Sequence, residues 1–192
     1  MARVLGKGSR RRNSPHYYSL EQIARAYGVP YRRIDNPNAP EFIESVRGRA
    51  ADLIVSVACP YILKDVLLTV PPQGCINIHH APLPRYKGMM PTFWQMYYGE
   101  TQVGVTIHYM AAKVDEGAAL FQDHLQVKRG ESLDHLICRS KRHGARCMAQ
   151  VLRQIAHGIQ REIHLDHAKS SYFTFPKPEE IREFRRKGYR AI

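Results

Sequence analysis

An apolar run at residues 51–58 constrains the fold of this 192-residue chain more than any other stretch. Six of its eight residues are aliphatic, which is typical of a strand covered on both faces in a parallel sheet. Two candidate helices flank the run. One begins near Pro40, and the other extends from Pro60 to about Leu68, with Pro60 suited to a first helical position.

Strands and helices alternate along most of the chain. This pattern favours an α/β fold with an open, mostly parallel, Rossmann-like sheet flanked by helices. Ligands of such sheets bind beyond the carboxyl ends of the strands. Further strands are expected at residues 29–34, 75–79, 103–110 and 118–127. Further helices are expected at residues 19–27 and 131–157, and Ser19 and Gln22 form a capping box at the start of the first of these.

The formal net charge of +12 is the most unusual bulk property. Basic residues cluster at 10–12, 139–146 and 182–190, which indicates either an anionic partner or a solvated basic surface. The run at 139–146 lies on an amphipathic helix, so a solvated surface is the better interpretation there. No apolar run approaches the length of a membrane span, and residues 1–13 do not read as a signal peptide.

The four cysteines show no CxxC or other metal-ligand spacing, so we expect a protein of the reducing cytoplasm. Composition divides the chain into a basic, irregular segment at 1–18, an α/β domain at 19–158 and a carboxyl-terminal appendage at 159–192. Gly6-Lys7-Gly8 in the first segment lacks the full pattern of a phosphate-binding loop. The appendage is expected to hold an edge strand at 172–175 and a short basic helix from Pro178.

Asn77 and His79 lie two residues apart on one predicted strand, so their side chains leave on the same face. Asp115 follows in a loop before Gly117. Each residue alone has an ordinary structural interpretation: a backbone-bonded amide, a core histidine and a turn carboxylate. Together an amide, an imidazole and a carboxylate are a plausible catalytic set.

Four blocks in order give these residues a family resemblance. They are Asn77-Ile78-His79, the Leu83–Gly88 loop with its Leu-Pro-x-Tyr-x-Gly pattern, Gly104–His108 and Asp115–Gly117. The region from about Ser19 to Gly158 resembles the folate-dependent formyltransferases. These include the glycinamide ribonucleotide, methionyl-tRNA and amino-sugar formyltransferases and the formyltetrahydrofolate hydrolases. The resemblance implies the formyltransferase fold and 10-formyltetrahydrofolate as donor substrate.

The resemblance also implies roles for individual residues. Asn77 would donate a hydrogen bond to the formyl oxygen, His79 would stabilise the oxyanion and move protons, and Asp115 would orient His79. No metal ligand is expected. The folate would contact residues of the two loops and the strand between them: Leu83, Pro84, Tyr86, Gly88, Met89, Met90, His108, Val114 and Gly117.

The acceptor is expected to be a primary amine, with an amino sugar on a nucleotide as the leading expectation, because the tail is shorter than the tRNA-binding domain of methionyl-tRNA formyltransferases. A methionyl-tRNA formyltransferase-like protein and a formyltetrahydrofolate hydrolase are alternatives. From other classes, His79, His108 and Asp115 could form a two-histidine, one-carboxylate metal site, or the chain could be an inactive remnant that binds RNA or a partner. Family members begin with a further βαβ unit, so the chain is expected to be shortened, and an open sheet edge would favour a homo-oligomer.

Overall fold

The computed structural model describes residues 17–192. Among the described residues, the chain divides into two compact units, with residues 17–35 in the first and Asn36–Ile192 in the second. The carboxyl-terminal residues belong to the second unit, and the domain boundaries expected after residues 18 and 158 stay predictions. The Gly6-Lys7-Gly8 motif and the arginines at 10–12 lie outside the described residues.

The first unit contains the helix α1 (Leu20–Ala26). The hydroxyl of Ser19 accepts a hydrogen bond from the Gln22 amide at 3.1 Å, as the capping box predicts, and the Gln22 side chain accepts from the Tyr18 amide. The strand predicted at residues 29–34 is wrong, since these residues are irregular. Pro30 lacks a backbone donor, and no described strand pairs with this segment.

The second unit is built on a four-stranded sheet. Its strands lie in the order β1 (Ile54–Val57), β2 (Cys75–His79), β4 (Gln102–Tyr109) and β5 (Ala119–Gln126). The α/β class is confirmed, but the expectation of mostly parallel pairing needs correction. β1 and β2 are parallel, whereas β2–β4 and β4–β5 are antiparallel. The loop between β4 and β5 is too short for the crossover that a parallel pair requires.

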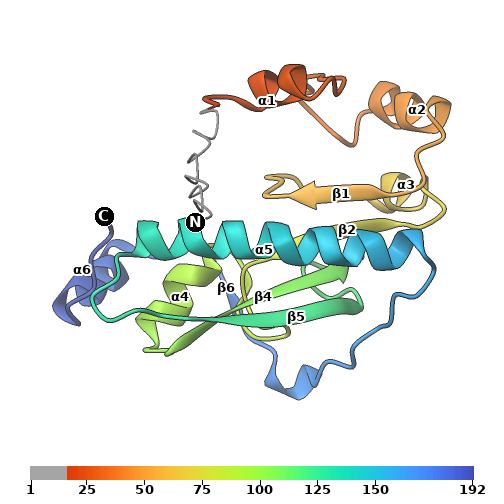
Figure 1. Ribbon diagram of the computed structural model, residues 1–192. Helices are drawn as coiled ribbons and strands as arrows, with labels where there is room; N and C mark the ends of the chain where they lie inside the picture. Colours follow the sequence, from red (N-terminus) through yellow and green to blue (C-terminus); the bar gives the residue numbers. More distant parts are fainter. Residues whose placement is uncertain (1–16) are drawn as a thin grey trace, which may run out of the picture. The chain divides into compact units, whose positions relative to one another are not determined.

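The helix α5 (Leu133–Ala156) lies along one face of this sheet (Figure 1). It packs on Ile76, Ile78, Val105 and Ile107. Gly144 allows close approach, because a Cβ atom at this position would lie 2.4 Å from Ile78 Cδ1. The buried side of α5 follows helical spacing, as predicted: Leu133, Leu136, Ser140, Gly144, Cys147, Met148, Val151 and Ile155.

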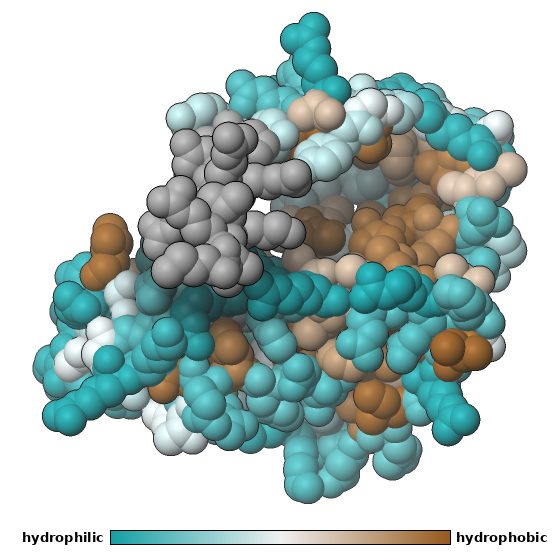
Figure 2. All heavy atoms as spheres, viewed as in Figure 1, coloured by the Kyte–Doolittle hydropathy of each residue, from teal (hydrophilic) through white to brown (hydrophobic). Residues whose placement is uncertain are grey.

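Two shorter helices pack near β1, which is an edge strand of the sheet: α2 (Pro40–Gly48) and α3 (Asp65–Leu68). The helix predicted from residue 60 begins only at residue 65. The side chain of Asn38 explains this start, since it donates to Ile62 O and accepts from Lys64 N and so holds the preceding segment extended. Figure 2 shows apolar side chains exposed over this part of the unit.

The tail joins the second unit through β6 (Tyr172–Phe173) and α6 (Pro178–Arg186), after a short 3-10 turn, η1 (His167–Lys169). The predicted strand at 172–175 is shorter than expected. It pairs in parallel with β3 (Lys87–Gly88) as a separate two-stranded sheet. Phe173 stacks on Trp94, which lies in α4 (Pro91–Tyr97), with ring centroids 4.8 Å apart. Phe184 of α6 is buried and stacks on Phe93.

Among residues 17–192, no helix combines the length and apolar character that crossing a membrane requires.

Candidate active site

Three of the predicted site residues lie on the face of the sheet opposite α5. The antiparallel register pairs Asn77 of β2 with His108 of β4, so their side chains meet on this face, and His79 lies two residues beyond Asn77. The Nδ2 atom of Asn77 is 3.3 Å from Nε2 of His108. The period-2 alternation that predicted a shared face for Asn77 and His79 is therefore confirmed.

Asp115 joins this group from the loop between β4 and β5. Its carboxylate lies between the two histidines, 3.4 Å from Nδ1 of His79 and 3.5 Å from Nε2 of His108. The amide of Gly88 donates a hydrogen bond to Asp115 Oδ2 at 2.9 Å. Only 9% of the Asp115 side chain is exposed, so the structure brings a nearly buried carboxylate against two buried imidazoles.

Two glycines make this arrangement sterically possible. A Cβ atom on Gly117 would lie 1.8 Å from the carbonyl oxygen of Tyr109, so only glycine lets the loop turn this close to β4. Gly88 has a φ of +90°, and a Cβ atom there would lie 2.2 Å from Phe173 O. Both positions were predicted as site residues, and both shape the backbone around Asp115.

The hydrogen bonds of His79 constrain its proton positions. Nε2 lies 2.8 Å from the carbonyl oxygen of Tyr86, which can only accept, so Nε2 carries a hydrogen. Nδ1 faces the Asp115 carboxylate. Any second proton on the ring is therefore shared with Asp115.

His108 has the opposite arrangement. Its Nδ1 donates to the carbonyl oxygen of Tyr109 at 2.8 Å, which leaves the lone pair of Nε2 to accept from the Asn77 amide. Burial lowers the pKa of His108, although the nearby Asp115 carboxylate acts in the other direction. A neutral His108 thus fixes which way the Asn77 side-chain amide points, a role that the sequence did not reveal.

The loop expected to bind folate has partners inside the protein. The amide of Leu83 donates to Thr106 Oγ1, and its carbonyl accepts from Gln122 Nε2. The side chains of Leu83 and Tyr86 are buried. Thr106 and Gln122 were not predicted as site residues. Their positions in the expected strands at 103–110 and 118–127 are the sequence feature that could have indicated them.

The remaining predicted folate contacts differ in exposure. The side chains of Met89 and Val114 are 43% and 38% exposed. Pro84 is buried, and Met90 is partly buried against α4 and its neighbours. Of the predicted contacts, Met89 and Val114 therefore offer the most accessible side chains near Asp115.

Tyr86 serves as a support for the loop. Its hydroxyl donates to the Glu100 carboxylate at 2.7 Å. Burial, together with this hydrogen bond, raises the pKa of Tyr86 to about 12. The phenol therefore stays neutral near pH 7 and holds the carbonyl that His79 contacts.

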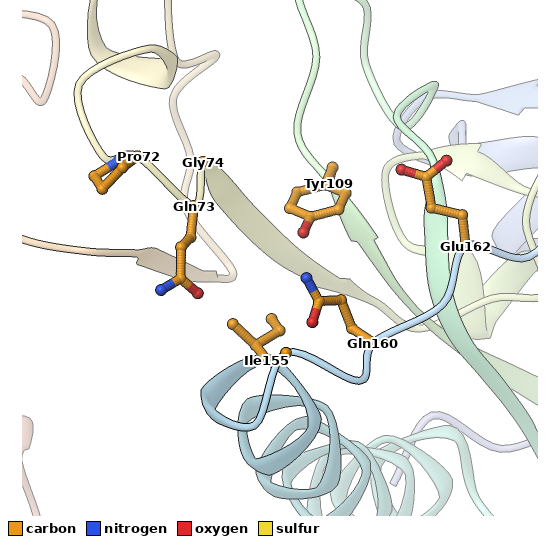
Figure 3. Close-up of a pocket in the computed structure, with 8 residues that line it drawn as sticks. Pro72, Gln73, Gly74, Tyr109, Ile155, Gln160 and Glu162 are labelled. Carbon is orange, nitrogen blue, oxygen red and sulfur yellow. The ribbon is translucent and has the colours of Figure 1, made fainter.

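A cleft of about 560 Å³ lies at the opposite end of β2, near the carboxyl end of α5 (Figure 3). Its lining includes Gln73, Tyr109, Gln160 and Glu162. None of Asn77, His79 and Asp115 borders it. The described residues that line this cleft include no imidazole and a single carboxylate, Glu162, so the cluster around Asp115 is the better catalytic candidate.

The family profile and the curated relatives that match this chain point to the same family. The family profile described as Formyl transferase matches residues 3–152. A methionyl-tRNA formyltransferase from Trichlorobacter lovleyi is 32% identical over 92% of this chain and 55% of its own length. One from Citrifermentans bemidjiense is 34% identical over 84% of this chain and 51% of its own length. The chain thus spans about half the length of these curated relatives.

Solved structures show the same fold. Glycinamide ribonucleotide transformylase 1 from Symbiobacterium toebii superposes with a TM-score of 0.67 and 25% identity, over 76% of this chain and 74% of that one. A sugar N-formyltransferase from a Shewanella species superposes with a TM-score of 0.67 and 19% identity, over 86% of this chain and 69% of that one.

Proposed function

Because the chain belongs to the formyl transferase family, we propose that it transfers a formyl group from 10-formyltetrahydrofolate to a primary amine. The observation that carries this proposal is the convergence of Asn77, His79 and Asp115 on one face of the sheet. An amide donor, an imidazole and a nearly buried carboxylate supply the groups that formyl transfer requires.

The reaction breaks one carbon–nitrogen bond and forms another. A neutral amine attacks the formyl carbon, negative charge develops on the formyl oxygen, and the folate nitrogen leaves with a proton while the amine loses one. Asn77, oriented by His108, is the uncharged donor suited to that oxygen. The His79–Asp115 pair can accept the proton from the amine and return one to the leaving nitrogen.

Two acceptors are worth direct comparison. The sequence favours an amino sugar attached to a nucleotide. The curated relatives at 32–34% identity are methionyl-tRNA formyltransferases, and this similarity is stronger support than a fold shared with sugar N-formyltransferases at 19% identity. Methionyl-tRNA is therefore the first acceptor to assay, and a nucleotide-linked amino sugar the second.

In this proposal, the bound folate contacts the exposed side chains of Met89 and Val114. The cytoplasmic location and the association of two copies stay predictions.

The test is a formyl-transfer assay with each acceptor, using wild type and the variants His79→Ala and Asp115→Ala. Each substitution should lower the rate by about 10²- to 10⁴-fold, because it removes proton transfer or oxyanion stabilisation. The matched control is His124→Ala, at an exposed position on β5. Circular dichroism should show that all variants keep the wild-type fold.

Retained turnover in either site variant would overturn the assignment of the site. Formate release that proceeds equally well without an amine would favour the hydrolase. Salt-dependent RNA binding without any turnover would favour the remnant.

A further inference from the structure

A second group of chemically reactive side chains lies on the other face of the sheet. His143 and Cys147 are four residues apart on α5, so they project from the same side of the helix. Asp123 lies opposite Val105 in the β4–β5 register, and Val105 packs beneath α5. The helix α5 and the strand β5 contact each other on this face of the sheet (Figure 1).

The donor atoms of this group are already close together. Nε2 of His143 lies 3.0 Å from Asp123 Oδ2 and 3.7 Å from Cys147 Sγ, and all three donor atoms lie within 4.8 Å of one another. Bonds of about 2.0–2.3 Å to a tetrahedral zinc ion place neighbouring ligand atoms about 3.3–3.8 Å apart. Small side-chain shifts would therefore bring the three atoms to coordinating positions.

The environment suits a metal better than an ion pair alone. An ion pair accounts for the contact between His143 and Asp123. It does not account for Cys147 Sγ, which lies against the same ring nitrogen of His143. Cys147 is only 4% exposed, whereas 47% of the Asp123 side chain is open to solvent. The group therefore has an enclosed sulfur at its base and an open side for ion entry and a fourth ligand.

The chemistry of the ligands limits which ion would fit. One sulfur, one imidazole nitrogen and one carboxylate oxygen form a set that zinc accepts, and calcium or magnesium would not select the sulfur.

We propose that Asp123, His143 and Cys147 form a site for one divalent transition-metal ion of the zinc type. The ion would join the edge strand β5 to the helix α5. No CxxC pattern marks this site in the sequence. Its local signal is the His-x-x-x-Cys spacing on α5, and its third ligand comes from a strand that only the fold brings near.

Cobalt titration of the full chain tests the proposal, because a cobalt–thiolate bond produces a charge-transfer absorption in the near ultraviolet. Wild type should develop this band, saturate at one equivalent of Co²⁺ and lose the band when Zn²⁺ is added. Cys147→Ser should abolish the band, whereas Cys138→Ser, at an exposed position on the same helix, should keep it. Asp123→Asn, at a largely exposed position, should weaken Co²⁺ binding roughly tenfold or more.

Absence of the band in wild type, or its persistence in Cys147→Ser, would overturn the proposal. Thermal unfolding provides a second measurement that needs no cysteine variant. Zn²⁺ should raise the melting temperature of wild type more than that of Asp123→Asn. An equal shift in the two proteins would equally contradict a site that uses Asp123.

Discussion

Asp115 holds its backbone at a φ of 54°, a left-handed conformation that residues other than glycine rarely adopt. Tyr86 and Met90, in the loop that borders it, have φ values of 59° and 52°. Each such residue costs on the order of 1–3 kcal/mol unless its surroundings compensate. The hydrogen bonds of Asp115 with Gly88 and of His79 with Tyr86 compensate for part of this cost. The loop geometry and the side-chain cluster therefore depend on each other.

His80, next to His79 in sequence, should control the acid stability of the protein. Burial, followed by the charges of His79 and Lys141, lowers the pKa of His80 to about 4. The unfolded chain therefore binds more protons than the folded protein between about pH 4 and 6.5, and stability falls as pH falls through this window. From pH 7.5 to pH 5 the free energy of unfolding should drop by about 2 kcal/mol from this residue.

Urea denaturation of wild type and His80→Gln at both pH values measures this contribution. The substitution should remove most of the pH-dependent loss, whereas His124→Gln, at an exposed position, should keep it. An unchanged pH dependence in His80→Gln would show that another group is responsible. His80 also contacts the Ser140 hydroxyl, so the comparison of pH slopes is more informative than stability at one pH.

At the residue scale, sequence reasoning succeeded where local periodicity carries the information. Asn77 and His79 share a face because strand side chains alternate. The family pattern led to Asp115 and Gly117, whose roles in the site stay predictions. The part of His108 in orienting Asn77 could not be read from the sequence, because it depends on the register between β2 and β4. Asp123 was not predicted as a site residue, because its place beneath α5 depends on the register between β4 and β5.

The β3–β6 pairing is a small element with a large steric demand at Gly88. Gly88→Ala should lower the free energy of unfolding by about 2–4 kcal/mol, because the new Cβ would meet a backbone oxygen at a positive φ. The same change should reduce formyl transfer, since the Gly88 amide supports Asp115. Urea denaturation and the transfer assay measure the two effects.

Gly48→Ala is the matched control for this substitution. Gly48 lies at the end of α2, and no atom lies within 4 Å of the position that its Cβ would take. Helix propensity favours alanine over glycine there by up to about 1 kcal/mol. Similar stabilities for the two variants would contradict the steric account of Gly88.

Elements with strong local signals were predicted well, and elements defined by tertiary contacts were not. The long helix α5 and the strands β4 and β5 follow clear apolar periodicity. Residues 60–64 have a helix-like start, yet Asn38 draws them into an extended conformation. The strand β3 was not predicted, and the strand predicted at 172–175 is longer than β6, because two-residue strands have no periodicity to detect.

At the scale of the whole molecule, the tail is part of the second compact unit and not a loose addition. Phe184→Ala should cost about 3–5 kcal/mol, because this ring is 2% exposed and stacks on Phe93 within the core. Ile181→Ala, on the same helix but 37% exposed, should cost less than about 1 kcal/mol. The denaturant midpoints of the two variants give the comparison. If Phe184→Ala lowered the free energy of unfolding as little as Ile181→Ala, this would show that α6 contributes little to the core.

The pairing of Lys87 with Tyr172 and of Gly88 with Phe173 also affects how the protein is made. The Gly88 segment holds the Asp115 carboxylate, but its partner strand comes about 85 residues later in the chain. A ribosome makes the protein from the amino end, so Asp115 leaves it well before Phe173 exists. The nascent chain can form the four-stranded sheet early, whereas the candidate site acquires its final shape only after Phe173 has been made.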